Sequence, residues 1–229
     1  MNSPVILEIC VESAASARAA AEGGAHRLEV CQNLDIGGTT PSAALIESCL
    51  RAVSIPVHVM IRPRGGDYSY SAEEFRAMGS DIEIAKRLGA HGVVVGILHP
   101  DGTVDVDRMK ELVGLARPLS VTFHRAFDDA IKPVESIEEV VRTGAERLLT
   151  SGQQARAENG LPLIAQLSAL VSGRLKLIAA AGIGRDNIHR IAALGRVNEI
   201  HVATAVRNKA SGEVDADLVR TIIAEVARV

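Results

Sequence analysis

Two short segments of the chain carry a glutamate and a cysteine in the same spacing. Residues 7–10 read LEIC and residues 28–31 read LEVC, so Glu8 precedes Cys10, and Glu29 precedes Cys31, by two positions. Side chains two apart on a strand share a face, and neighbouring strands lie ~4.8 Å apart. Cys10 and Cys31, at equivalent positions on adjacent strands, could therefore hold a soft ion such as Cu(I). The alternative is two small buried apolar side chains, as free cysteines often are.

Two arginines stand in the segment IRPRGGDY, residues 61–68. Pro63 ends a strand there, and the two glycines that follow Arg64 give a tight loop. Arginine binds carboxylates and phosphates through two parallel hydrogen bonds, so Arg62 and Arg64 are candidate anion-binding residues. For Arg64, a solvated loop charge is an equally good interpretation.

The segment TFHRAFD, residues 122–128, offers acid–base chemistry. His124 follows a strand and could act as a general base or bind a metal. Arg125 and Thr122 are candidate ligand-binding neighbours, and Asp128 could orient His124 or Arg125.

Glycine-containing turns follow two later strands, in LTSGQ (149–153) and AAAGIGRDN (179–187). Turns of this kind that lead into a helix are ready anion sites. We therefore expect Ser151, Gly152, Gly182 and Gly184 to contribute to anion binding, although the glycines could serve as turn residues only.

These segments must be positioned by an alternation of strands and helices. Eight strands are predicted, at residues 5–10, 27–31, 57–62, 93–96, 119–124, 147–150, 175–179 and 199–203. Four of the intervening helical segments end in glycine just before the next strand, which is the typical return of a βα unit. Eight such units predict an α/β protein with a (β/α)8 TIM barrel, as one domain over residues 1–229. A doubly wound open sheet is the alternative, but no G-x-G-x-x-G follows the first strand.

The alternation of side chains predicts a polar barrel interior. In each strand, the alternate positions that carry aliphatic side chains should face the helices. The remaining positions then face the barrel interior, which places Glu8, Cys10, Glu29 and Cys31 inside, together with residues of later strands. These are His58, Met60, Arg62, Ser120, Thr122, His124, Glu199 and His201. Buried glutamates need partners, and Arg62 and Arg125 are the predicted ones. Met60 and His201 are further candidate metal ligands by parity alone, and a salt-bridge network that only plugs the barrel is the alternative to a site.

Composition excludes some classes of partner. The net charge of −3 gives no reason to expect nucleic acid or an acidic membrane surface. Three cysteines, an odd number, do not make a disulfide framework, and the N-terminus lacks the basic start of a signal peptide. We therefore expect a cytoplasmic protein with reduced thiols.

Taken together, these stretches resemble the CutC family over nearly the whole chain. The pair IRPRGGD and TFHRAFD is the most specific part of the match, and LEIC, GGAHRLEVC, LLTSGQ and AGIGRDNIH extend it. The resemblance implies a TIM barrel, a cytoplasmic location, a role in copper handling, and a homodimer or higher homo-oligomer. Cys10 and Cys31 match the cysteines usually proposed to bind copper in this family. The chain departs from the family pattern after His201, where it reads VATAV.

Two main functions follow from these residues. In the first, Cys10 and Cys31 bind Cu(I) in copper homeostasis. In the second, the barrel is an enzyme for a small anionic or phosphorylated metabolite, clamped by Arg62 and Arg125 while His124 moves a proton with Glu8 or Glu29. A third reading is an interaction scaffold, but no large apolar patch is evident in the sequence.

Overall fold

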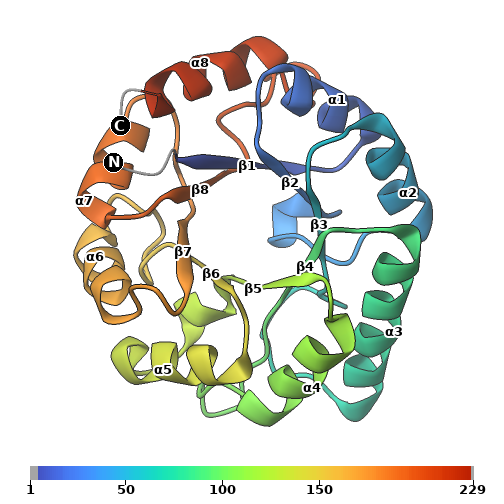
Figure 1. Ribbon diagram of the computed structural model, residues 1–229, viewed down its shortest axis with the longest axis vertical. Helices are drawn as coiled ribbons and strands as arrows, with labels where there is room; N and C mark the ends of the chain where they lie inside the picture. Colours follow the sequence, from blue (N-terminus) through green and yellow to red (C-terminus); the bar gives the residue numbers. More distant parts are fainter. Residues whose placement is uncertain (1–4, 228–229) are drawn as a thin grey trace.

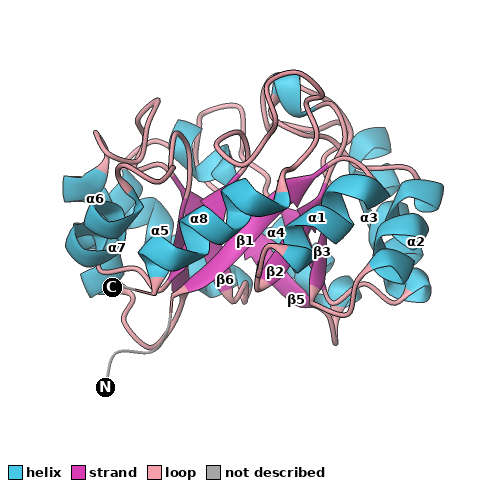
Figure 2. Ribbon diagram, turned by 90° about the horizontal axis from the view of Figure 1, so that it is seen from above, coloured by secondary structure: helices cyan, strands magenta, loops and turns pink. Residues whose placement is uncertain are grey.

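The computed structural model describes residues 5–227 and confirms the predicted (β/α)8 barrel. Eight parallel strands pair in chain order and close with β8 against β1. Figure 1 looks down the barrel, with the helices as an outer ring around the strands. Figure 2 shows the same barrel from the side, with loops projecting beyond one end.

The elements alternate without interruption. The strands are β1 (Ile6–Val11), β2 (Arg27–Val30), β3 (Val57–Met60), β4 (Gly92–Val95), β5 (Ser120–Phe123), β6 (Arg147–Thr150), β7 (Lys176–Ala179) and β8 (Glu199–Val202). The helices are α1 (Ala14–Glu22), α2 (Ala43–Ala52), α3 (Ala72–Leu88), α4 (Val106–Ala116), α5 (Pro133–Thr143), α6 (Leu161–Leu170), α7 (Ile188–Gly195) and α8 (Ala216–Val226). Short 3-10 helices follow β2 (η1, Leu34–Ile36) and β5 (η2, Arg125–Asp129).

Strand β3 ends earlier than the sequence predicts. Its last residue is Met60, because the backbone N–H of Arg62 donates to the hydroxyl of Thr40 and leaves the strand ladder. The side chain of Arg62 nevertheless keeps its predicted inward direction at the barrel mouth.

Glycine ends the helices largely as predicted. Gly89 closes α3 with a φ of 90°, a left-handed conformation that side chains with a Cβ disfavour, and its N–H bonds to Ala85 O. After α7 the pattern differs, since Gly195 is the last helical residue and Arg196 takes the left-handed conformation with a φ of 53°.

The described residues form three apolar clusters, one outside the barrel and two inside it. The outward aliphatic side chains of the strands join the helices in one large core. Inside the barrel one small cluster holds Cys10, Cys31, Met60 and Val94, and another holds Leu149, Ile178 and Ala180. The predicted inward direction is therefore confirmed for Cys10, Cys31 and Met60. None of the described helices is long and apolar enough to cross a membrane.

Candidate functional site

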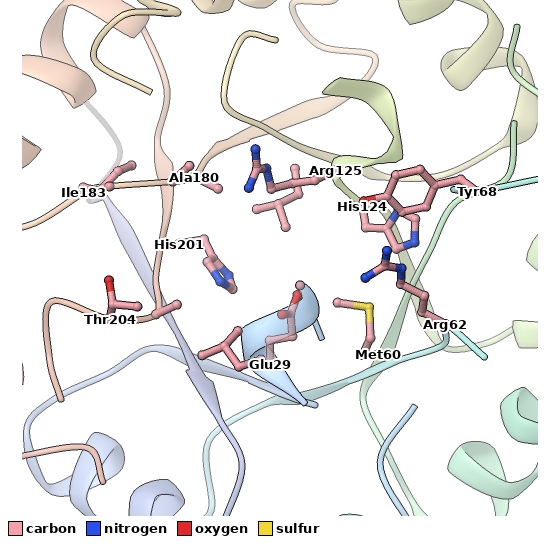
Figure 3. A pocket seen from close by; sticks show the side chains of 16 residues that line it. Glu29, Met60, Arg62, Tyr68, His124, Arg125, Ala180, Ile183, His201 and Thr204 are labelled. Carbon is pink, nitrogen blue, oxygen red and sulfur yellow. The ribbon is translucent and has the colours of Figure 1, made fainter. Parts of the chain in front are cut away.

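A cavity opens at the carboxyl ends of the strands, where barrels of this type carry their sites. Its volume is about 240 Å³. Figure 3 shows Glu29 and His201 on one side of it, and His124, Tyr68 and Arg62 on the other. The described residues that line it are Glu29, Leu34, Gly37, Met60, Arg62, Tyr68, His124, Arg125, Leu149, Ala180, Ala181, Gly182, Ile183, His201, Ala203 and Thr204.

Below the cavity, the buried carboxylates pair with arginines that the sequence analysis did not select. Arg27 donates to Glu8 at 2.5 Å and to Glu199 at 2.6 Å, and Arg147 pairs with Glu199 at 3.1 Å. The predicted partners, Arg62 and Arg125, bind elsewhere, so that prediction was wrong. Arg27 shares the inward parity of Glu29 two residues later, which is the signal that could have identified it.

Glu8 belongs to this network and is not among the described residues that line the cavity. Burial would raise the pKa of Glu8, but Arg27 and His201 hold it well below its usual range. His201 Nδ1 lies 2.8 Å from Glu8 Oε1. Burial opposes the charged form of His201, yet Glu29 and Glu8 together outweigh it and raise the pKa of the imidazole.

Glu29 lies between this network and the cavity. Burial raises the pKa of Glu29 to about 7, and the Glu8 carboxylate adds to the effect. Its Oε2 is buried without a hydrogen-bond partner among the described residues. Burying a polar atom without a partner is costly, so Glu29 is a candidate to receive a hydrogen bond from a ligand.

The thiols of Cys10 and Cys31 are in contact, but the two residues do not occupy the equivalent strand positions that the sequence predicts. Cys10 Sγ lies 3.1 Å from Cys31 Sγ, and both residues are fully buried. They are not at equivalent positions, because the strand register pairs Cys10 with Glu29 and Cys31 lies beyond the end of β2. Tilted barrel strands place residues paired across the hydrogen bonds at different heights on the barrel axis, which lets two offset side chains come together.

The surroundings of Cys10 contain other metal-binding groups. Ligand atoms of Cys10, Glu29 and His201 all lie within 4.8 Å of one another. The hydrogen bond to Cys31 and burial raise the pKa of the Cys10 thiol. A metal would therefore have to displace a proton from the sulfur.

On the opposite wall, His124 is held as a neutral hydrogen-bond donor. Its Nδ1 accepts from Ala126 N at 3.2 Å, which places the proton on Nε2, and Nε2 is buried without a partner among the described residues. Burial, together with the neighbouring Arg62, lowers the pKa of His124 to about 3. The Tyr68 ring, which the sequence analysis did not select, lies 5.1 Å from the imidazole and 4.8 Å from the Arg62 guanidinium.

The predicted anion site after β6 is filled by the chain itself. Asp128 accepts from Thr150 Oγ1 at 2.5 Å, from Ser151 N at 3.0 Å and from Gln153 N at 3.2 Å. Asp128 also pairs with Arg125 Nε at 2.7 Å. The Ser151 N–H and hydroxyl therefore donate to Asp128, and the Gly152 N–H donates to Thr150 Oγ1, so the chain itself supplies the anion at this turn.

Of the other predicted ligand-binding residues, one lines the cavity and three do not. Gly182 lines the cavity, whereas the Gly184 N–H is taken by Asn187 Oδ1 at 2.9 Å. Arg64 pairs with Glu74 at 2.5 Å and with Asp67 at 3.1 Å. It therefore stabilises the loop after β3 and does not line the cavity. Thr122 is buried inside the barrel with its hydroxyl unpartnered among the described residues, and does not line the cavity.

Glycines at the start of β4 and directly after its end make room for the interior histidines. A Cβ at Gly96, the residue after β4, would lie 2.5 Å from His124 Nδ1, and a Cβ at Gly92 would lie 2.6 Å from the His58 ring. Both distances are shorter than non-bonded atoms tolerate, so both positions need glycine. This pairing between strands is not visible in a single segment of sequence.

Comparison with known proteins fits these features. The model of the CutC family matches residues 5–206. The chain belongs to the CutC family. A family protein CutC from Chromobacterium violaceum is 47% identical over 213 residues, covering 90% of this chain and 86% of that protein. A relative of the same name from Bacteroides fragilis is 46% identical, covering 86% of this chain and 78% of its own length.

Solved structures support the same assignment. A protein from Streptococcus agalactiae named as a copper homeostasis protein CutC has a TM-score of 0.83 at 30% identity, covering 87% of this chain and 98% of its own. N-(5'-phosphoribosyl)anthranilate isomerase from Pyrococcus furiosus has a TM-score of 0.67 at 17% identity, covering 98% and 100%. The second likeness shows the barrel fold alone.

Proposed function

We propose that this protein acts in cytoplasmic copper homeostasis by binding Cu(I) through Cys10 and Cys31. The observation that carries the proposal is the 3.1 Å contact between two buried free thiols. Thiolates and thioethers are the ligands that Cu(I) prefers, and Met60 packs in the same interior cluster. His201 and Glu29 complete a donor set suited to a metal ion.

Proton release accompanies this binding. Because the pKa of Cys10 is raised, a metal must displace its proton before the thiolate can coordinate. Glu29 is placed to accept it, since Glu29 and Cys10 share a hydrogen bond. The residues thus offer both soft ligands and a nearby proton acceptor.

Titration of the reduced protein with Cu(I) against a competing chelator tests the proposal. The Cys10→Ser, Cys31→Ser double variant is expected to bind at least about tenfold more weakly, since both soft ligands are lost. Cys49→Ser is the matched control, because Cys49 is also buried and free but lies in α2. Stoichiometric Cu(I) binding that survives in the double variant would contradict the proposal.

A second candidate function is an enzyme for a small anionic metabolite. The observation that favours it is the buried guanidinium of Arg62 in the cavity wall beside His124. Of the predicted catalytic residues, Glu29 and His124 line the cavity, whereas Glu8 and Asp128 serve internal contacts. Incubation with a mixture of small metabolites, followed by NMR, is expected to reveal selective conversion of an anionic compound. No conversion by the wild type would contradict catalysis.

A further inference from the structure

The wall of the cavity holds a positive charge, on Arg62, that no described carboxylate neutralises. Arg62 is 4% exposed, and its guanidinium donates to the carbonyl oxygens of Ile36, Gly38 and Gly66. These acceptors are uncharged, and no described carboxylate pairs with Arg62. A buried charge without a partner is strongly unfavourable. An anion in the cavity would supply the missing charge.

The histidine beside Arg62 determines what that anion must offer. His124 is 2% exposed, and because Nδ1 accepts from Ala126 N, its Nε2 is a donor that no described residue satisfies. Figure 3 shows the imidazole next to Arg62 at the same side of the cavity. A ligand oxygen placed there accepts from Nε2–H while its charge faces the guanidinium. A carboxylate provides such an oxygen.

The opposite wall of the cavity has a hydrogen-bond acceptor without a donor, the carboxyl group of Glu29. Glu29 is 3% exposed, and its Oε2 has no partner among the described residues. Glu29 lies across the cavity from His124 (Figure 3). A hydroxyl group on the ligand satisfies this oxygen. The same molecule would therefore carry an oxyanion at one end and a hydroxyl at the other.

The charges disfavour a phosphate monoester. Such a group carries about −1.5 to −2 charges at neutral pH. Of the two described arginines that line the cavity, only Arg62 has no carboxylate partner, since Arg125 is already neutralised by Asp128. The β6 turn, which would otherwise receive a phosphate, is filled by the Asp128 carboxylate. The Gly184 N–H after β7 is bonded to Asn187. One unpaired cation matches one carboxylate.

We propose that the cavity binds a small hydroxycarboxylate, with its carboxylate at Arg62 and His124 and its hydroxyl at Glu29. This inference rests on the second candidate function and names its substrate class. The cavity volume of about 240 Å³ restricts the ligand to a compound of a few carbon atoms. Met60, Leu149 and Ile183 provide apolar walls for its carbon chain.

Calorimetric titration with four probes tests the inference: 3-hydroxypropionate, glycerate, propionate and 3-phosphoglycerate. 3-Hydroxypropionate or glycerate is expected to bind at least about tenfold more tightly than propionate, which lacks the hydroxyl. The phosphorylated probe is expected to bind no more tightly than glycerate. His124→Asn is the key variant, because an asparagine oxygen can still cap Ala126 N while the Nε2 donor is lost.

His124→Asn is expected to weaken binding of the hydroxy acid at least about tenfold, and Arg62→Met to abolish it. Should Arg62→Met fail to fold, His124→Asn carries the test. Tighter binding of 3-phosphoglycerate, or binding unchanged in His124→Asn, would overturn the inference but leave the second candidate function standing. If no probe bound, the inference would be overturned. If the wild type also converted no metabolite, the enzymatic function would be overturned too. Cu(I) binding by the thiols is tested by the separate Cu(I) titration.

Discussion

Replacing Arg27 by methionine is expected to lower the free energy of unfolding by about 3–5 kcal/mol, the usual effect of removing one partner of a buried ion pair. Arg27 bridges Glu8 and Glu199, which are 1% and 5% exposed. His201 and Arg147 would still contact the two carboxylates, but one positive charge would be missing from the interior. Uncompensated charge in the barrel is the reason for the large effect.

Urea unfolding at pH 7 measures this loss. Arg51→Met is the matched control, because Arg51 pairs with Glu47 at 2.6 Å on the surface, where its side chain is 77% exposed. An exposed pair of this kind contributes about 0.3–0.5 kcal/mol. If Arg27→Met were as stable as Arg51→Met, the interior network would not be what compensates the buried glutamates.

The polar interior could be predicted because strand parity is a local property. In β1, Leu7 and Ile9 belong to the outer core, and the alternate positions Glu8 and Cys10 must then point inward. The same argument holds for His201 on β8. The positions of these side chains follow from short segments, so no knowledge of other strands is needed.

The partners within the interior could not be predicted in the same way. Which arginine meets Glu8 depends on the stagger between β1 and β2, where Glu8 pairs with Arg27. The filling of the β6 turn by Asp128 depends on how η2 packs against a strand that follows it by about one βα unit. Both contacts are set by closure of the barrel, which is a property of all eight strands together.

The two proposed functions share residues at their boundary, and Glu29 is the clearest of them. Glu29 contacts Cys10 on the thiol side and lines the cavity on the other. The thiols are fully buried, whereas Met60 and His201 reach the cavity. A copper ion would therefore approach the sulfurs through the same mouth that a small metabolite would enter. Occupation of the mouth by one is expected to affect access of the other.

Acidification from pH 7 to pH 5 is expected to cost the folded protein about 4 kcal/mol through His58 and His124, about 2 kcal/mol for each. Burial lowers the pKa of each imidazole to about 3, from an ordinary value of 6.5. Between these values the unfolded chain binds protons that the folded chain does not. The stability is therefore complete above pH 6.5 and is lost as the pH falls.

Glu29 acts in the opposite direction, because a carboxyl whose folded pKa is about 7 takes up a proton in the folded state first as the pH falls. The histidine effect is isolated by comparing the wild type with a His58→Asn, His124→Asn double variant in urea at both pH values. Glu29 is present in both proteins, so its contribution largely cancels. The wild type is expected to lose about 4 kcal/mol more than the variant between pH 7 and pH 5. Equal losses would show that the two imidazoles become protonated without unfolding, which their burial beside Arg27 and Arg62 opposes.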